Sequence, residues 1–270
     1  MWTAQGLRRP LPITTIFDVG KFWVGGREAL VESGSGPHAT LQIAGRARGA
    51  REKFGEGHLL RNLGDAGAQV LKRHLGAGFV VGLSWGTAVS ATVDALEVER
   101  PVETKIVQLV GALGARNTEY DGHALVSRLA EKLGGESYYL NAPFPCPTAD
   151  MASALLETQS VKETVSLGRQ VQVALLGVGS TSLQYSGYYL SGYVPLKEMN
   201  LLQEAGAGGN VCGIHFDISG AETCLDFCGR LVSIRKPDLF GLPVRIGVAG
   251  GRRRWSPFWD PSAAAMSPLW

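Results

Sequence analysis

Short apolar runs alternate with amphipathic stretches between about residue 60 and residue 249 of this chain. Apolar runs of about four to eight residues bounded by turn residues are typical of buried strands, whereas apolar residues three or four positions apart predict helices. The predicted strands are 79–83, 105–110, 137–140, 171–178 and 244–249, with antiparallel strands at 211–217 and 230–233. The predicted helices are 63–75, 87–96, 121–133, 148–156, 160–169 and 196–205.

This alternation of buried strands and helices predicts an α/β fold, with a parallel, Rossmann-like sheet flanked by helices on both faces. Ligands of such sheets bind in a crevice at the carboxyl ends of the strands. Four predicted strands end in loops of small residues, at 82–86, 111–114, 177–180 and 247–251. We therefore expect these four loops to converge on one pocket.

The strongest local motif is the turn that follows the strand at 79–83 and leads into the helix at 87–96. Gly82 and Gly86 let backbone amides approach a ligand closely. The amides and the positive dipole end of the helix attract a phosphate or another oxyanion. Ser84 and Thr87 add hydroxyl donors. The alternative is a plain strand-to-helix turn in which Thr87 caps the helix, and the motif by itself leaves both interpretations open.

Composition supports a globular protein and points to no polyanionic partner. The chain has 270 residues, of which 45% are hydrophobic and 19% charged, with 36 glycines and a net charge of +2. That charge is too near neutral to indicate nucleic acid or membrane binding. No apolar run is long enough to span a bilayer, and the N-terminus does not resemble a signal peptide. We expect a cytoplasmic protein without a membrane partner.

A series of further motifs resembles the effector-binding domain of SorC-type transcriptional regulators over about residues 51–251. It begins with the 80–87 turn and the segment Val107–Gly114. In the same order follow 123–135, 140–143, 175–180, 216–217 and 247–251. The resemblance implies a fold like that of sugar-phosphate isomerases and a pocket for a phosphorylated sugar or a related metabolite. It also implies a homo-oligomer that regulates transcription by binding DNA.

The same resemblance implies roles for particular residues. Ser84, Gly86 and Thr87 would hold the phosphate, and Gln108 and Gly111 would contact sugar hydroxyls. A third edge would come from Gly179 and Ser180. Two positions depart from the family pattern. Asn210 stands where members often carry an acidic residue, and Arg254 stands where many carry a lysine after the Gly-Gly pair.

The two ends of the chain lack the pattern of the middle. Residues 1–50 are poorly patterned, with one short predicted strand at 19–24 and no recognisable DNA-binding helix-turn-helix, and residues 252–270 form an atypical tail. The final elements of a SorC-type domain are not recognisable either. We expect both ends to be out-of-frame translations around a genuine core, so a non-functional truncated remnant is one alternative for the whole chain.

Catalytic and metal-binding patterns are weak. No histidine lies in a recognisable triad. We expect His123 to be a residue of the helix surface or a helix cap. One interpretation of Cys212, His215, Cys224 and Cys228 is a zinc cluster; the alternative is that the cysteines are small buried hydrophobes, as cysteines of cytosolic proteins mostly are. We expect no catalytic residue, no metal and no cofactor. The alternative to a sensor domain is an enzyme of the sugar-phosphate isomerase or deaminase kind, which needs a carboxylate base in the pocket.

Overall fold

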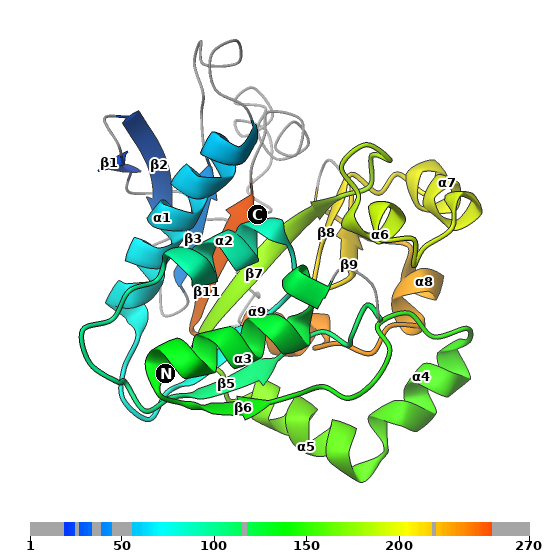
Figure 1. The fold of residues 1–270 in the computed structure, drawn as a ribbon. Helices are drawn as coiled ribbons and strands as arrows, with labels where there is room; N and C mark the ends of the chain where they lie inside the picture. Colours follow the sequence, from blue (N-terminus) through cyan, green and yellow to red (C-terminus); the bar gives the residue numbers. More distant parts are fainter. Residues whose placement is uncertain are drawn as a thin grey trace, which may run out of the picture.

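The computed structural model describes residues 19–24, 27–33, 39–44, 56–114, 118–217 and 220–249. Their strands form one mixed sheet with helices on both faces (Figure 1). The strands are β1 Val19–Val24, β2 Arg27–Ser33, β3 Ala39–Ala44, β4 Val80–Leu83, β5 Lys105–Gln108, β6 Glu136–Tyr138, β7 Val173–Ser180, β8 Gly209–Val211, β9 Ile214–Phe216, β10 Glu222–Thr223 and β11 Val244–Ala249. The helices are α1 Glu56–His74, α2 Thr87–Ala95, the 3-10 turn η1 Thr118–Tyr120, α3 Gly122–Leu133, α4 Ala149–Leu156, α5 Gln159–Gly168, α6 Gly187–Leu190, α7 Leu196–Glu204, α8 Leu225–Gly229 and α9 Lys236–Gly241.

The central strands are parallel, as the sequence predicts. The order along the sheet is β1-β2-β3-β11-β7-β4-β5-β6, and every pairing from β3 to β6 is parallel. Alternate residues of β7 enter opposite cores: Val173 and Leu175 pack beneath α1, α2 and α3, whereas Ala174 and Leu176 face the second layer. Burial on both faces explains why these strands appear as continuous apolar runs in the sequence.

The strand β7 pairs with different partners along its length. Its first part, from Val173 to Gly177, lies between β4 and β11. Its last part, Val178–Ser180, pairs antiparallel with β8 instead. The strand β8 in turn pairs antiparallel with β9, and β9 with β10. This divergence opens the sheet at the carboxyl end of β4, where a ligand crevice is expected.

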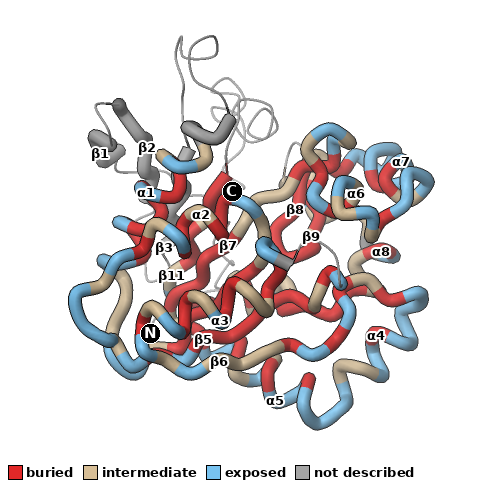
Figure 2. The backbone as a smooth tube through the Cα atoms, in the orientation of Figure 1, coloured by how far each residue is buried: buried red, intermediate tan, exposed pale blue. Residues whose placement is uncertain are grey.

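Helices α1 and α2 cross at close range because glycine lies at the crossing. A Cβ on Gly64 would lie 2.4 Å from the carbonyl oxygen of Ala91, and one on Gly67 would lie 2.4 Å from Oγ1 of Thr92. The contact holds α2 against the sheet, with Ala88, Val89 and Val93 buried beneath it. Figure 2 shows the buried residues concentrated along the central strands and the exposed ones on the outer faces of the helices.

Two predictions from the sequence need correction. The segment 211–217 is not one strand, because Cys212 and Gly213 adopt φ angles of 52° and 81° and turn the chain back between β8 and β9. Residues 230–233 form only isolated bridges, with Ser233 opposite Val110 and Leu231 opposite Pro145. The segment 1–50 contains the predicted strand β1 and also β2 and β3, of which β3 extends the parallel sheet beside β11.

Candidate functional site

A cavity of about 280 Å³ lies at the carboxyl ends of the central strands. Each of the four predicted small-residue loops, or the strand end beside it, contributes to its lining. Ser84 and Gly86 follow β4, Leu113 follows β5, Gly177 and Gly179 belong to β7, and Val248 belongs to β11. The remaining lining comes mainly from α6 and from β8 with the turn after it, which no local motif marks.

The first wall of the cavity is the turn from β4 into α2. Gly86 is the N-cap of α2 and adopts φ 132°, a conformation that favours glycine. The Gly86 amide donates to the Tyr120 carbonyl at 3.2 Å, so η1 lies against the start of the helix. Gly86, Thr87 and Ala88 all line the cavity, and the α2 N-terminus therefore faces it. Backbone N–H groups at such an end attract anions.

Ser84 ties this wall to the neighbouring strand. Its Oγ accepts a hydrogen bond from the Gly177 amide at 2.8 Å, and its own amide donates to the Leu175 carbonyl at 3.1 Å. A Cβ on Gly177 would lie 2.9 Å from the Trp85 carbonyl oxygen, so the two strand ends meet only because Gly177 is glycine. The Ser84 hydroxyl proton has no acceptor among the described residues and is available to a ligand.

The second wall is built by Asn210 of β8 and Tyr188 of α6. The Tyr188 hydroxyl donates to Oδ1 of Asn210 at 2.6 Å, and both side chains are buried. The Asn210 side chain covers Gly179, where a Cβ would lie 2.6 Å from Nδ2. Burial raises the pKa of the Tyr188 phenol well above its usual value of 10, so the phenol stays protonated.

A cluster of aromatic rings joins the two walls: Trp85 and Tyr188 line the cavity, and Phe144 is buried against both. The Trp85 ring lies 5.5 Å from Tyr188 and 6.0 Å from Phe144, edge to face with the latter, and Phe144 lies 5.3 Å from Tyr188. Such pairs add stability beyond their buried area. They also keep the two walls at a fixed separation, because Trp85 belongs to the first wall and Tyr188 to the second.

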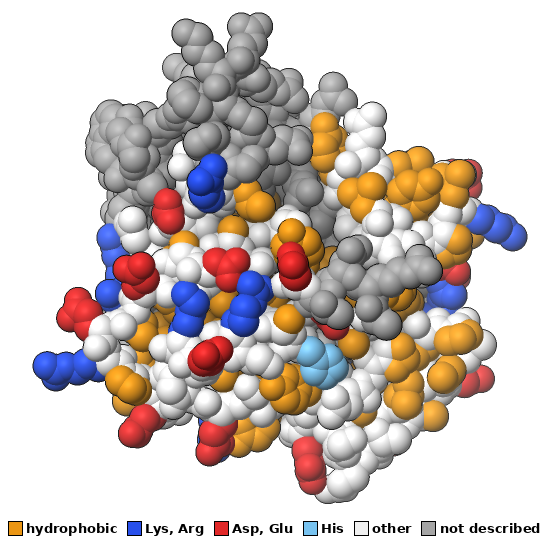
Figure 3. All heavy atoms as spheres, viewed as in Figure 1, with side chains coloured by type: hydrophobic (Ala, Val, Ile, Leu, Met, Phe, Trp, Pro, Cys, Tyr) orange, Lys and Arg blue, Asp and Glu red, His pale blue; other side chains and the backbone are white. Residues whose placement is uncertain are grey.

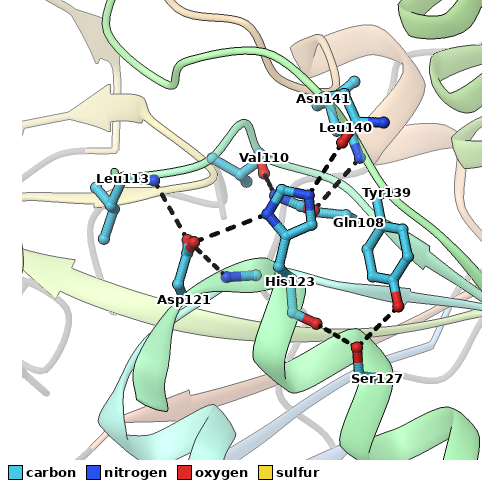
Figure 4. Close-up of polar contacts among 10 residues, drawn as sticks. Gln108, Val110, Leu113, Asp121, His123, Ser127, Tyr139, Leu140 and Asn141 are labelled. Atoms are coloured by element: carbon cyan, nitrogen blue, oxygen red, sulfur yellow. Dashed lines mark hydrogen bonds and ion pairs between the residues drawn. The ribbon is translucent and has the colours of Figure 1, made fainter. Parts of the chain in front are cut away.

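The loop that follows β5 is held by Asp121 (Figure 4). Its Oδ1 accepts hydrogen bonds from the Gly122 amide at 2.8 Å and from the Leu113 amide at 3.2 Å. Asp121 thus caps α3 and fixes Leu113 at the cavity. The His123 ring packs at a tilt against Tyr139, with 5.0 Å between the ring centroids, and its Nε2 lies 3.1 Å from Oδ1 of Asn141. It lies on the surface of α3 and does not line the cavity.

The predicted site residues are only partly brought together. Ser84, Gly86, Thr87, Gly179 and Asn210 line the cavity, whereas Gln108, Gly111 and Ser180 do not, and Gly82 is buried in β4. Arg254 lies outside the described residues.

The three predicted residues that do not line the cavity, Gln108, Gly111 and Ser180, contact other parts of the protein backbone instead. Gln108 donates to the Val110 carbonyl at 2.7 Å and accepts from the Leu140 amide, so its polar atoms brace the backbone (Figure 4). A Cβ on Gly111 would lie 2.7 Å from the Ala142 carbonyl oxygen. The Ser180 hydroxyl accepts from the Ser182 amide at 3.1 Å.

Cys212, His215 and Cys228 lie close to the second wall. The Sγ of Cys228 lies 3.7 Å from Nδ1 of His215, and Cys212 lines the cavity. Burial raises the pKa of Cys212 to about 12 and lowers the pKa of His215 to about 4, so both are neutral near pH 7. Within the part of the chain that the structure describes, no set of three or more His, Cys, Asp or Glu side chains is placed to hold a metal ion.

The fold is that of the putative sugar-binding domains. The chain belongs to the Sugar-bind family ("Putative sugar-binding domain"), whose model matches residues 50–256. The erythritol catabolism regulatory protein EryD of Brucella abortus is 28% identical over 200 residues, which cover 73% of this chain and 62% of that protein. The sorbitol operon regulator of Klebsiella pneumoniae is 26% identical over 199 residues, covering 73% of this chain and 63% of that protein. The chain thus spans less than two thirds of the length of these relatives.

Solved structures share the fold. The full-length sorbitol operon regulator SorC of Klebsiella pneumoniae superposes with a TM-score of 0.71 at 23% identity, over 80% of this chain and 68% of that one. A transcriptional regulator from Streptococcus pneumoniae gives a TM-score of 0.71 at 20% identity, over 81% of each chain. At these identities the likeness shows the fold alone. None of the helices within the described residues combines the length and hydrophobicity needed to cross a bilayer.

Proposed function

We propose that this chain is the effector-sensing part of a transcriptional regulator and that its cavity binds a small phosphorylated sugar derivative. The observation that carries the proposal is the N-terminus of α2, which faces the cavity beside the hydroxyls of Ser84 and Thr87. Backbone amides and hydroxyls hold a phosphate without requiring a lysine or arginine. The relatives are named as regulators of erythritol catabolism and of a sorbitol operon, which suggests the class of ligand.

The ligand would act by preferring one conformation of the regulator over another, because a ligand shifts an equilibrium only by its differential affinity. DNA contact, a homo-oligomer and a cytoplasmic location belong to this proposal for the whole regulator. On the face drawn in Figure 3, acidic and basic side chains are interspersed across α2 and α3, with Arg128 of α3 paired to Asp94 of α2 at 2.7 Å. A face of mixed charge does not favour binding of DNA by this part of the domain.

The chemistry of the cavity favours a sensor over an enzyme. Isomerisation or deamination of a sugar phosphate needs a general base within hydrogen-bond reach of the substrate. No Asp, Glu, His, Lys or Arg is among the described residues that line the cavity. Cys212, the lining thiol, has a pKa of about 12 because it is buried, so it is a poor nucleophile near neutral pH.

The test is a thermal-shift screen of the purified chain against sugar and polyol phosphates of three to six carbons, with each unphosphorylated sugar as the matched control. Product formation is followed in the same wells. We expect a phosphorylated compound to raise the melting temperature by mass action, its unphosphorylated counterpart to have little effect, and no product to form. Turnover would assign the enzyme instead, and the absence of any cooperative melt would support the non-functional remnant.

A further inference from the structure

The hydrogen bond between Tyr188 and Asn210 determines which end of the Asn210 amide faces the cavity. The Tyr188 phenol is buried and stays protonated, and the acceptor of its proton is Oδ1 of Asn210 at 2.6 Å. An amide has two chemically different ends, an acceptor oxygen and a donor nitrogen. Because the oxygen is occupied by Tyr188, the nitrogen remains for another partner.

The Asn210 nitrogen has no hydrogen-bond partner among the described residues, although Asn210 is 6% exposed and lines the cavity. The cavity lining that the structure describes contains no Lys or Arg that could replace it. His215, which pairs with Asn210 across β8 and β9 and lies 5.9 Å from the Tyr188 ring, is neutral near pH 7. The second wall therefore offers a ligand an uncharged donor. A group of this kind suits a carbonyl oxygen, which accepts hydrogen bonds and cannot donate one.

The two donor groups of the cavity are separated along β7. Ser84 contacts Gly177, whereas Asn210 lies against Gly179, two residues further along the strand. Two residues of a strand correspond to about 7 Å. A ligand that uses both groups must carry its phosphate and its second acceptor at well-separated carbons of one short chain.

We propose that Asn210, oriented by Tyr188, is the specificity-determining residue of the cavity, and that it selects a phosphorylated sugar with a free carbonyl group over the matching polyol phosphate. This inference rests on the proposed function, because the α2 N-terminus must hold the phosphate. A polyol hydroxyl in place of the carbonyl is a weaker acceptor, and its own proton finds no acceptor on Asn210. An unpaired polar group in a closed site lowers affinity.

Ribulose 5-phosphate and ribitol 5-phosphate are the probes that isolate this choice. The ketose phosphate stays open-chain because its terminal oxygen is phosphorylated, and the two compounds differ only at carbon 2. We expect the full chain to bind ribulose 5-phosphate about tenfold more tightly by calorimetry. Equal affinities, or tighter binding of ribitol 5-phosphate, would overturn the inference and leave the proposed function in place. A cooperatively melting chain that binds neither these compounds nor any other phosphate of the screen would overturn both.

Two variants assign the preference to Asn210. Asn210→Asp replaces the donor nitrogen by an acceptor oxygen and still accepts the Tyr188 proton, so we expect the preference to reverse toward ribitol 5-phosphate. The control Asn200→Asp makes the same change on an exposed position of α7 and should leave the ratio of affinities unchanged. If Asn210→Asp does not fold, Tyr188→Phe frees the amide to turn either end to the ligand, and the ratio should approach one. A variant that folds and keeps the preference of the original chain would overturn the role of Asn210.

Discussion

The two walls of the cavity are specified in different ways. The first wall, formed by Ser84, Gly86 and Thr87, arises from consecutive residues in the turn between β4 and α2. The second wall joins Tyr188 of α6 to Asn210 of β8, which are 22 residues apart in the sequence. In the function proposed above, the first wall binds an anion through backbone amides and the helix dipole, whereas the second acts through one oriented side chain. On this proposal the capacity to bind an anion is encoded locally, and discrimination between ligands depends on tertiary packing.

The largest loss of ligand affinity is expected for a substitution of Gly86, because the first wall depends on the backbone conformation at this residue. Gly86 has φ 132° and open space around its Cα, so a side chain there is strained without colliding with a neighbour. Gly86→Val should destabilise the fold by about 1–3 kcal/mol and shift the first turn of α2. We expect ribulose 5-phosphate to bind at least about 100-fold more weakly by calorimetry.

The control for this variant is Gly78→Val. Gly78 lies between α1 and β4 at φ 76°, also with nothing near a Cβ, and it does not line the cavity. It should lose comparable stability in urea unfolding while ligand affinity changes little once the protein is folded. Equal losses of affinity in the two variants would show that general destabilisation, and not the α2 N-terminus, governs binding.

The second wall differs from the first in its response to pH. His215 is fully buried, and its Nε2 has no hydrogen-bond partner within the described part of the chain. Burial lowers its pKa from 6.5 to about 4. Between these values the unfolded chain binds a proton that the folded chain does not, so stability is full above about pH 6.5 and falls as the pH drops toward 4. The loss at about pH 5 is on the order of 2 kcal/mol.

Urea unfolding at about pH 7 and about pH 5 measures this loss, and His215→Asn should remove most of the difference between the two values. Cys228 and Tyr188, the titratable groups in contact with His215, have pKa values raised by burial and stay neutral throughout this range. An unchanged pH dependence in His215→Asn would place the acid sensitivity elsewhere in the molecule.

The contrast between the walls also explains what the sequence could predict. The buried strands β4, β7 and β11 and the turn at Gly86 follow from apolar runs and from glycine, which are local signals. The resemblance to the SorC family implied that Gln108, at the end of a strand, contacts the ligand, but its amide braces the Val110 and Leu140 backbone. Whether a polar side chain at a strand end faces the cavity depends on the segments that cross it, and no local pattern shows these.

Tyr188 of the second wall was missed for the same reason. Tyr188 lies in a short helix without an amphipathic repeat, and its partner Asn210 was identified only through a departure from a family pattern. The reversal at Cys212 and Gly213 depends on positive φ angles in a segment that alternates like one strand. An internal alternation does not reveal where a strand turns back, because both arms of a hairpin keep the period of two.

A smaller effect is expected for Ser84, which serves both the fold and the ligand. Ser84→Ala removes the acceptor of the Gly177 amide and should cost about 1 kcal/mol of stability, because this amide is only partly buried. It also removes a hydroxyl from the proposed phosphate site, so affinity for ribulose 5-phosphate should fall about tenfold. Ser166→Ala, on the exposed side of α5, is the matched control and should change neither quantity. A stability loss with unchanged affinity would restrict Ser84 to a structural role.

The smallest loss of ligand affinity is expected for a substitution of Thr87. This substitution distinguishes the contribution of the side-chain hydroxyls of the first wall from that of its backbone amides. Thr87 is exposed and follows Gly86, which is the N-cap of α2, so its hydroxyl is not the cap that begins the helix. Thr87→Ala should therefore change stability by less than about 0.5 kcal/mol and weaken binding of ribulose 5-phosphate by only about two- to fivefold. Thr87→Ser keeps the hydroxyl and should bind like the original chain. A loss as large as that of Gly86→Val would mean that side-chain donors, rather than the amides of α2, hold the phosphate, and the first wall would then depend on individual side chains as the second does.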